Sequence, residues 1–174
     1  MTLRHLAATV ALVATLLLSA CAITILPDTR GGQVDPPPVA GPRPVVIERF
    51  EATRTSYRVG DGTAFRIRTN QAGFVTLTAY NPDGSTYPIA RNVPVSGNRL
   101  EAIPGPFSRI LFTAEPPVGR HVVRAHFTPE RTPESVSFRG IVTLDAWLAA
   151  IFLEIRAYGF SAEDVAEVRV DIRR

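Results

Sequence analysis

The sequence contains no lysine and only one cysteine, one methionine and one tryptophan. All 19 basic residues are arginines, which we attribute to a coding bias, because an interface would rarely require every lysine to be replaced. A chain with one cysteine cannot form an internal disulfide, so an apolar core must stabilise the folded part. The arginines are scattered among 16 acidic residues, whereas nucleic-acid binding needs a concentrated basic stripe. The composition therefore argues against a nucleic-acid partner.

Recognisable catalytic and cofactor-binding motifs are also missing from the sequence. It has no His-x-x-x-His pair, no second cysteine and no glycine-rich phosphate loop. Beyond the first 20 residues it has two histidines, His121 and His126, which fall on opposite faces of one expected strand and so cannot share a metal ion. Paired acids occur only in turn-like segments, where carboxylates are normally solvated. We therefore expect a non-enzymatic protein with no catalytic residues, no metal and no cofactor.

The first 21 residues carry a targeting pattern. Arg4 and His5 precede an uncharged apolar run over residues 6–18, which is short for the ~30 Å hydrocarbon core of a bilayer and typical of a signal peptide. The sequence Leu-Ser-Ala-Cys at residues 18–21 then resembles the lipobox of bacterial lipoproteins. This resemblance implies that residues 1–20 are removed, that lipid is attached to the Cys21 thiol, and that the new amino terminus is acylated. An ordinary secreted signal peptide with an incidental cysteine is the alternative.

The residues that follow Cys21 suggest a location and a spacer. Ala22 stands where lipoproteins retained in the inner membrane carry aspartate, so we expect a lipid anchor in the cell envelope, in the outer membrane, facing either the periplasm or the surface. Residues 21–44 are rich in proline and glycine and lack hydrophobic periodicity. Such segments favour extended polyproline II at about 3.1 Å per residue, so a tether is predicted. A proline-rich recognition ligand is the alternative.

Residues 45–174 show the pattern of a β protein. Apolar and polar residues alternate in two runs within residues 64–89, and Asn81-Pro82-Asp83-Gly84 supplies a turn after the second run. About seven short strands with turn signals between them predict an immunoglobulin-like antiparallel β-sandwich. The expected strands lie within residues 45–51, 64–89, 99–103, 109–114, 119–127 and 165–173, and residues 91–97 are expected to form a loop.

One segment near the end has helical spacing instead. The pattern predicts an amphipathic helix over residues 143–158, with Thr143 as its N-cap and Gly159 as its stop. We expect it to pack over an open end or flank of the sandwich, although a partner or a membrane surface is the alternative. The strand at 165–173 should return to the sheet, which makes the helix an inserted crossover. The apolar positions that define the helix are Leu144, Trp147, Leu148, Ile151, Phe152 and Ile155.

An ordered set of turn motifs resembles a known family. The motifs are Tyr57–Asp61, Asn70 with Gly73–Val75, Tyr80–Gly84, Ile103-Pro104 and Pro117–Gly119. Over about residues 45–127 this set resembles the bacterial domain of unknown function 4384. The family's pattern has an apolar residue, proline and asparagine in succession after the hairpin. In this chain three residues separate Pro88 from Asn92. The resemblance implies an envelope protein, often a lipoprotein, with an immunoglobulin-like domain and no established activity, so no catalytic residue is carried over.

Three arginines on outward strand positions are the candidate ligand-binding residues. Arg66 and Arg68 alternate with core residues of one strand, and Arg124 does so on a later strand. A guanidinium presents a planar fork that suits the carboxylates and phosphates of envelope glycans and lipid headgroups. An ordinary solvated sheet face is the alternative interpretation.

Together these features favour a non-enzymatic envelope lipoprotein that binds or scaffolds another envelope component, either a protein or a glycan. An outward-displayed glycan-binding or adhesin-like module is the second hypothesis. A hydrolase with an unrecognised site is the third, and it would need converging acids and a histidine in a deep pocket.

The lipid anchor is directly testable. We expect the natural chain to fractionate with membranes, and mass spectrometry of its mature amino terminus to show acylated Cys21. Cys21→Ala should remove the modification and release the domain from the membrane fraction, because the acyl chains supply the membrane affinity. A soluble natural chain with an unmodified terminus would instead identify a freely secreted domain.

Overall fold

The computed structural model describes residues 45–174. Cys21, the signal peptide and the tether lie outside the described residues, so their assignments stay predictions. Among the described residues, the only α-helix is too short to be a membrane span.

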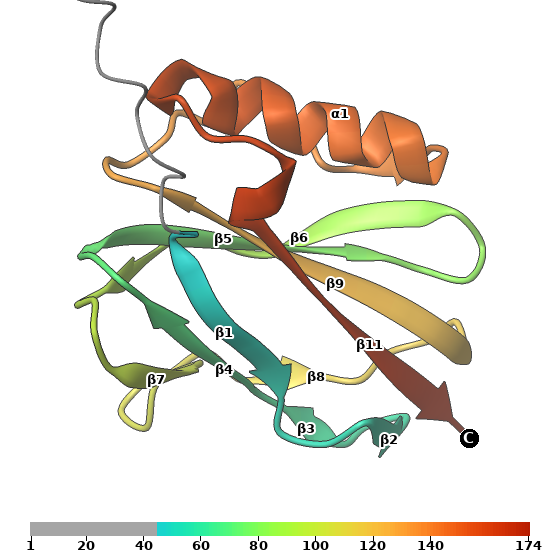
Figure 1. The fold of residues 1–174 in the computed structure, drawn as a ribbon. Coiled ribbons are helices and arrows are strands. Elements are labelled where there is room, and N and C mark those ends of the chain that lie inside the picture. Colours follow the sequence, from blue (N-terminus) through green and yellow to red (C-terminus); the bar gives the residue numbers. More distant parts are fainter. Residues whose placement is uncertain (1–44) are drawn as a thin grey trace, which may run out of the picture. The chain divides into compact units, whose positions relative to one another are not determined.

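Two β-sheets pack face to face in the folded domain (Figure 1). The first sheet has the order β1 (Ile47–Ala52), β4 (Phe65–Thr69) and β7 (Leu100–Ile103). The second has the order β10 (Gly140–Ile141), β6 (Ser85–Val95), β5 (Gly73–Tyr80), β9 (Gly119–Thr128), β11 (Val165–Arg173) and β2 (Ser56–Arg58). A short additional ribbon pairs β3 (Gly62–Thr63) with β8 (Phe112–Thr113).

The order of the main strands is that of an immunoglobulin-like sandwich. Counting β1, β4, β5, β6, β7, β9 and β11 along the chain, the first, second and fifth form one sheet and the others form the second. This division matches strands A, B and E against C′, C, F and G of immunoglobulin domains. The prediction of a mainly β sandwich with a helix and a closing strand is therefore confirmed. Within the described chain, the one parallel pairing joins β2 to the end of β11.

Alternating side chains build the core between the sheets. In β4 the buried residues Phe65, Ile67 and Thr69 alternate with the exposed Arg66 and Arg68, as the period of a strand requires. The same alternation buries residues 123, 125 and 127 of β9. These positions confirm the inward faces that the sequence predicts for both strands.

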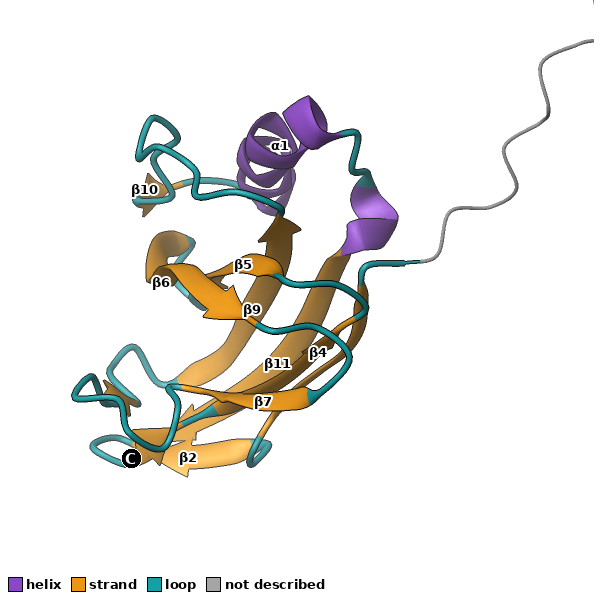
Figure 2. Ribbon diagram, turned by 90° about the vertical axis from the view of Figure 1, so that its left-hand side faces the viewer, coloured by secondary structure: helices purple, strands orange, loops and turns teal. Residues whose placement is uncertain are grey.

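The helix α1 (Leu144–Ile155) covers the outer face of the second sheet (Figure 2). Its start is fixed by Thr143, whose side chain accepts a hydrogen bond from the Ala146 N–H at 3.2 Å. It continues as the 3₁₀ turn η1 (Arg156–Tyr158) and ends at Gly159, which adopts a positive φ of 75°. The predicted cap, stop and packing on the flank of the sandwich are confirmed, and η2 (Ala162–Asp164) leads from here into β11.

Residues 91–97 do not form the loop that the sequence suggested, because β6 continues through most of them to Val95. Arg91 and Asn92 together stand opposite the single residue Thr76, which is a β-bulge, and Asn92 has a positive φ of 52°. A second extra residue, Ile89, lies just before it in the same strand. Both bulges lie between Pro88 and Val93. They break the period-2 alternation there, which is why the strand was missed.

Two substitutions in α1 should separate its buried face from its exposed face. Ile151 is fully buried against the sheet, so Ile151→Ala should lower the free energy of unfolding by about 2–5 kcal/mol through cavity formation. Leu153→Ala is the control, since Leu153 is half exposed on the same helix and its loss should cost less than about 1 kcal/mol. Urea unfolding measures both. Equal losses would contradict the packing described here.

Candidate functional site

A buried polar cluster lies between α1 and the second sheet. Glu154 of α1 accepts hydrogen bonds from the Thr132 hydroxyl at 2.7 Å and from Arg91 Nη2 at 2.9 Å, and its carboxylate lies 3.3 Å from His126 Nε2. The bulge in β6 directs Arg91 and Asn92 toward this cluster, where the amide of Asn92 bonds the backbone of Thr132 in both directions. The cluster joins β6, β9 and the loop before α1 to the helix.

Burial and charge act in opposite directions on the Glu154 carboxyl. Burial favours its neutral form, but the hydrogen bonds from His126 and Thr132 and the charges of His126 and Arg91 outweigh this and hold the pKa of Glu154 below its usual value. Glu154 is therefore ionised at neutral pH and paired with the Arg91 guanidinium. Because His126 is 0% exposed, a dissolved substrate cannot reach this histidine and carboxylate. The arrangement suits holding the helix rather than catalysis.

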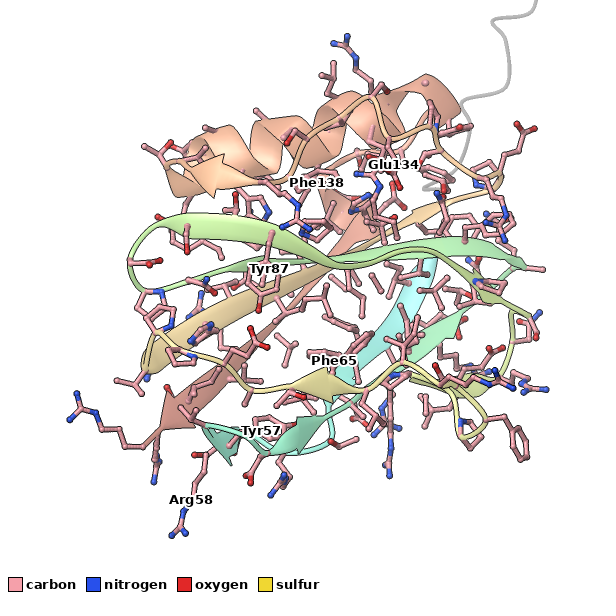
Figure 3. The ribbon with its side chains drawn as sticks, turned by 180° about the vertical axis from the view of Figure 1, so that it is seen from behind. Tyr57, Arg58, Phe65, Tyr87, Glu134 and Phe138 are labelled. Atoms are coloured by element: carbon pink, nitrogen blue, oxygen red, sulfur yellow. The ribbon has the colours of Figure 1, made fainter. Side chains whose placement is uncertain are left out.

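Arginines in the same layer pack against aromatic rings. The Arg91 guanidinium lies 4.9 Å from the centre of the Phe138 ring, which sits beneath α1 (Figure 3). The Arg124 guanidinium lies 4.4 Å from the Trp147 ring and bonds Glu167 of β11 at 3.1 Å. Cation–π contacts of this kind are strengthened when the cation is desolvated. Arg124 therefore helps to fix α1.

His121 and His126 lie on opposite faces of β9, as the sequence predicts, but both are buried. His121 Nε2 is 2.7 Å from the carbonyl oxygen of Pro117, and Nδ1 is 2.8 Å from Oδ1 of Asn81. Burial lowers the pKa of His121 below its usual value, although the Pro117 carbonyl and nearby carboxylates oppose this. His121 therefore joins the turn at Asn81 to the segment before β9. Among the described residues, no group of three metal-ligating side chains is close enough to hold an ion.

A small cavity beside His121 lies between the two sheets. It has a volume of about 40 Å³ and is lined by Tyr57, Phe65, Tyr87 and Glu115 among others. That volume has room for water molecules but not for a sugar or a nucleotide. Burial, together with the charge of Glu115, raises the pKa of Tyr87, so the phenol stays protonated. The cavity is therefore a defect in the packing rather than a ligand pocket.

The three arginines singled out in the sequence are not brought together. Arg66 and Arg68 lie on the first sheet, 3.8 Å from Glu51 and 2.8 Å from Glu48 respectively. Arg124 lies on the second sheet beneath α1, where it is largely buried. Its outward position on the strand does not expose it, because the helix covers that face. The three therefore do not form one surface.

A different set of arginines lines an open cleft of about 520 Å³ at the edge of the second sheet. Figure 3 shows Tyr57 and Arg58 of this region at the end of the domain remote from α1, with Arg58 pointing away from the body. Tyr57 is buried and its hydroxyl accepts a hydrogen bond from the Arg54 N–H at 3.0 Å, which fixes the floor. The lining residues are Arg54, Ser56, Tyr57, Arg58, Asp61, Arg173 and Arg174.

Two arginines occupy paired strand positions at this cleft. The parallel pairing of β2 with β11 places Arg58 directly beside Arg173, and like charges at paired positions are destabilising. Asp61 is engaged by Arg54 at 3.4 Å and by the backbone N–H of Arg58 at 2.9 Å. In the described part of the chain, neither Arg58 nor Arg173 has a carboxylate paired with its guanidinium. The cleft therefore presents guanidinium groups that an anion could bridge.

Sequence reasoning missed both clusters for a common reason. Arg58 follows a turn motif and Arg173 ends the closing strand, and neither shows its partner until the register of β2 on β11 is known. Glu154 falls on the apolar side of α1, and its spacing from Ile151 and Ile155 was a signal that a buried acid with a partner was present.

Residues 56–131 match the family model described as Domain of unknown function (DUF4384). The chain thus carries a domain that resembles DUF4384. No curated protein and no solved structure matches the chain. The DUF4384 match includes Arg58, Arg91 and His126 but ends before α1 and β11, so Glu154 and Arg173 lie outside it. Both clusters are completed by the segment that follows the DUF4384 region.

The buried acid makes a pH prediction. Because the folded pKa of Glu154 lies below its usual value of 4.5, its stabilising contribution is complete above that pH and is lost as pH falls through the folded pKa. Glu154→Gln should therefore lower the free energy of unfolding at pH 7 by about 3 kcal/mol, because Arg91 is left without its partner. The difference from the natural chain should shrink as the pH falls below 4.5 and through the lowered pKa of Glu154.

Urea unfolding at several pH values measures this difference. Glu134→Gln is the matched control, because Glu134 is exposed on the loop before α1 and should show little effect at any pH. A loss for Glu154→Gln that equals the control, or that persists unchanged in acid, would contradict the assignment.

Proposed function

We propose that the protein is a non-enzymatic, lipid-anchored protein of the cell envelope whose β-sandwich domain binds an acidic component of that envelope through the arginine cleft. The observation that carries the proposal is the side-by-side placement of Arg58 and Arg173 without a carboxylate between them. A carboxylate or phosphate oxygen placed between two guanidiniums accepts charge-assisted hydrogen bonds from both and removes their repulsion.

The side chains of the other polar clusters already contact partners within the fold, which leaves the arginine cleft as the candidate binding surface. His126 and Glu154 are buried beneath α1, and both ring nitrogens of His121 lie within 2.8 Å of oxygen atoms of the fold. The paired acid Asp164 caps the turn η2 by accepting from the Ser161 N–H at 2.9 Å. These residues have structural partners, whereas Arg58 and Arg173 line an open surface.

The lipobox at Cys21 and the Pro-rich segment 21–44 support the envelope location. Under this proposal the anchor fixes the chain to a membrane, most simply the outer membrane, and the Pro-rich segment between anchor and domain lets the domain reach groups at or near that surface. Acidic groups are then close at hand in two forms, as carboxylates of glycans and as phosphates of lipid headgroups. An outward-displayed glycan-binding module is the first of these cases.

Binding measurements with matched variants test the proposal. A chain beginning at Ala22 keeps every residue of both apolar clusters, which lie within residues 45–174. Calorimetric titration with a glucuronate oligosaccharide and with pyrophosphate distinguishes the two sources of negative charge, and a neutral oligosaccharide serves as the blank. Arg58→Gln with Arg173→Gln should weaken binding of the preferred anion at least about tenfold, because two charged hydrogen bonds are lost.

The matched control removes the same charge from another surface. Arg66→Gln with Arg68→Gln lies on the first sheet, where each arginine already has a glutamate partner, and should leave the affinity nearly unchanged. If both double variants lost the same affinity, the effect would be one of net charge and would not identify the arginine cleft as the binding site. No binding to either anion, together with no partner crosslinked in intact envelopes, would remove the proposed function.

A further inference from the structure

The loop between β7 and β8 holds the three most exposed large apolar side chains in the described part of the chain. Phe107 is 98% exposed, Leu111 is 82% exposed and Ile110 is 66% exposed. The loop projects from the lower left of the domain in Figure 1, on the opposite side from α1. Large apolar groups gathered at a projecting tip mark a contact surface, because soluble surfaces otherwise show such residues singly.

The loop is held in shape by its own bonds. The Ser108 N–H donates to the Gly105 carbonyl at 3.0 Å, and the Ile110 N–H donates to the Ser108 hydroxyl at 3.1 Å. Pro104 and Pro106 further restrict the backbone on the entry side. These bonds and rings reduce the backbone freedom that is lost when the tip is buried.

Charge and shape indicate what covers the tip. The loop itself, residues 104–111, contains one cation, Arg109, and no acid, and the nearest acids in the sequence are Glu101 and Glu115, which lie beyond it. The loop therefore carries a net positive charge. A projecting wedge of this kind does not need a complementary pocket if the partner is fluid. Apolar side chains beside a cation are the combination that suits the interface of a bilayer containing anionic lipids.

We propose that Phe107, Ile110 and Leu111 insert into the lipid surface and that Arg109 lies at the level of the headgroup phosphates. The choice of a bilayer as occupant rests on the proposed lipid anchor at Cys21. At about 3.1 Å per residue, an extended segment of residues 21–44 would be longer than the roughly 14 Å radius of gyration expected for such a domain. The tether therefore allows the face with the loop to turn toward the membrane that holds the anchor.

Vesicle flotation of the unlipidated chain from Ala22 tests the insertion without the anchor. The vesicles contain phosphatidylethanolamine and phosphatidylglycerol in a ratio of about three to one, which gives an anionic surface. The natural chain should float with the vesicles. Phe107→Gln with Leu111→Gln should lower the partition coefficient at least about tenfold, because the apolar area leaves the bilayer.

Two control variants identify the surface responsible. Leu144→Gln with Leu153→Gln makes the same kind of change at the exposed apolar residues of α1 and should leave flotation unchanged. Arg58→Gln with Arg173→Gln removes the arginine cleft and should reduce flotation less than the loop variant does. Failure of the natural chain to float, or a loop variant that floats as well as the natural chain, overturns the inference. The anion affinity of the cleft would be unaffected by either result, so the proposed function would stand.

A photo-crosslinking amino acid at Phe107 in the natural lipoprotein distinguishes lipid from the other possible occupants. Adducts to phospholipid support insertion. A discrete protein adduct without lipid, or a crosslinked pair of copies of this chain, would overturn it in favour of a protein contact.

Discussion

The ion pair between Arg91 and Glu154 is the contact on which the layer outside the sandwich depends. It joins a bulge in β6 to the last turn of α1, and His126 and Thr132 complete it. Taking a carboxylate and a guanidinium out of water costs several kcal/mol, so such a pair specifies a position more than it adds stability. Here it joins the last turn of α1 to β6 and β9, beside the apolar cluster formed by Trp147, Ile151 and Ile155. That placement in turn delivers the chain to β11, the strand that carries Arg173.

Local periodicity made a large part of this fold predictable. The alternation in β4 and β11, the helical spacing of α1, the cap at Thr143 and the stop at Gly159 depend only on neighbours within a few residues. The bulge at Arg91 was not predictable in this way, because a bulge is defined by the partner strand. Glu154 was missed for a related reason. The spacing predicted which face of the helix is apolar, but it could not predict that an arginine and a histidine of the sheet lie opposite a glutamate on that face.

The different contacts made by the arginines show why residue type alone could not identify the site. In a chain without lysine, arginine serves every cationic purpose. Arg66 and Arg68 are neutralised by glutamates on the adjacent strand, and Arg124 is stacked on Trp147. Arg58 and Arg173 differ from these arginines in their neighbour: each lies beside the other. The distinguishing property belongs to the register of a parallel pairing between strands at opposite ends of the domain's sequence, and no local pattern encodes it.

If the chain is anchored, confinement near the membrane would affect the apolar loop and the arginine cleft differently. A tethered domain meets its own membrane at an effective concentration far above that of a free protein, so even a small apolar wedge at Phe107 can stay inserted. The cleft gains from the same confinement only for ligands attached to that membrane or to the layer next to it. Insertion of the loop after β7 would also restrict the domain's rotation, and so select the directions in which the edge formed by β2 and β11 can face. The loop would then contribute to specificity by orientation, while the charge pattern of Arg58 and Arg173 would select the ligand.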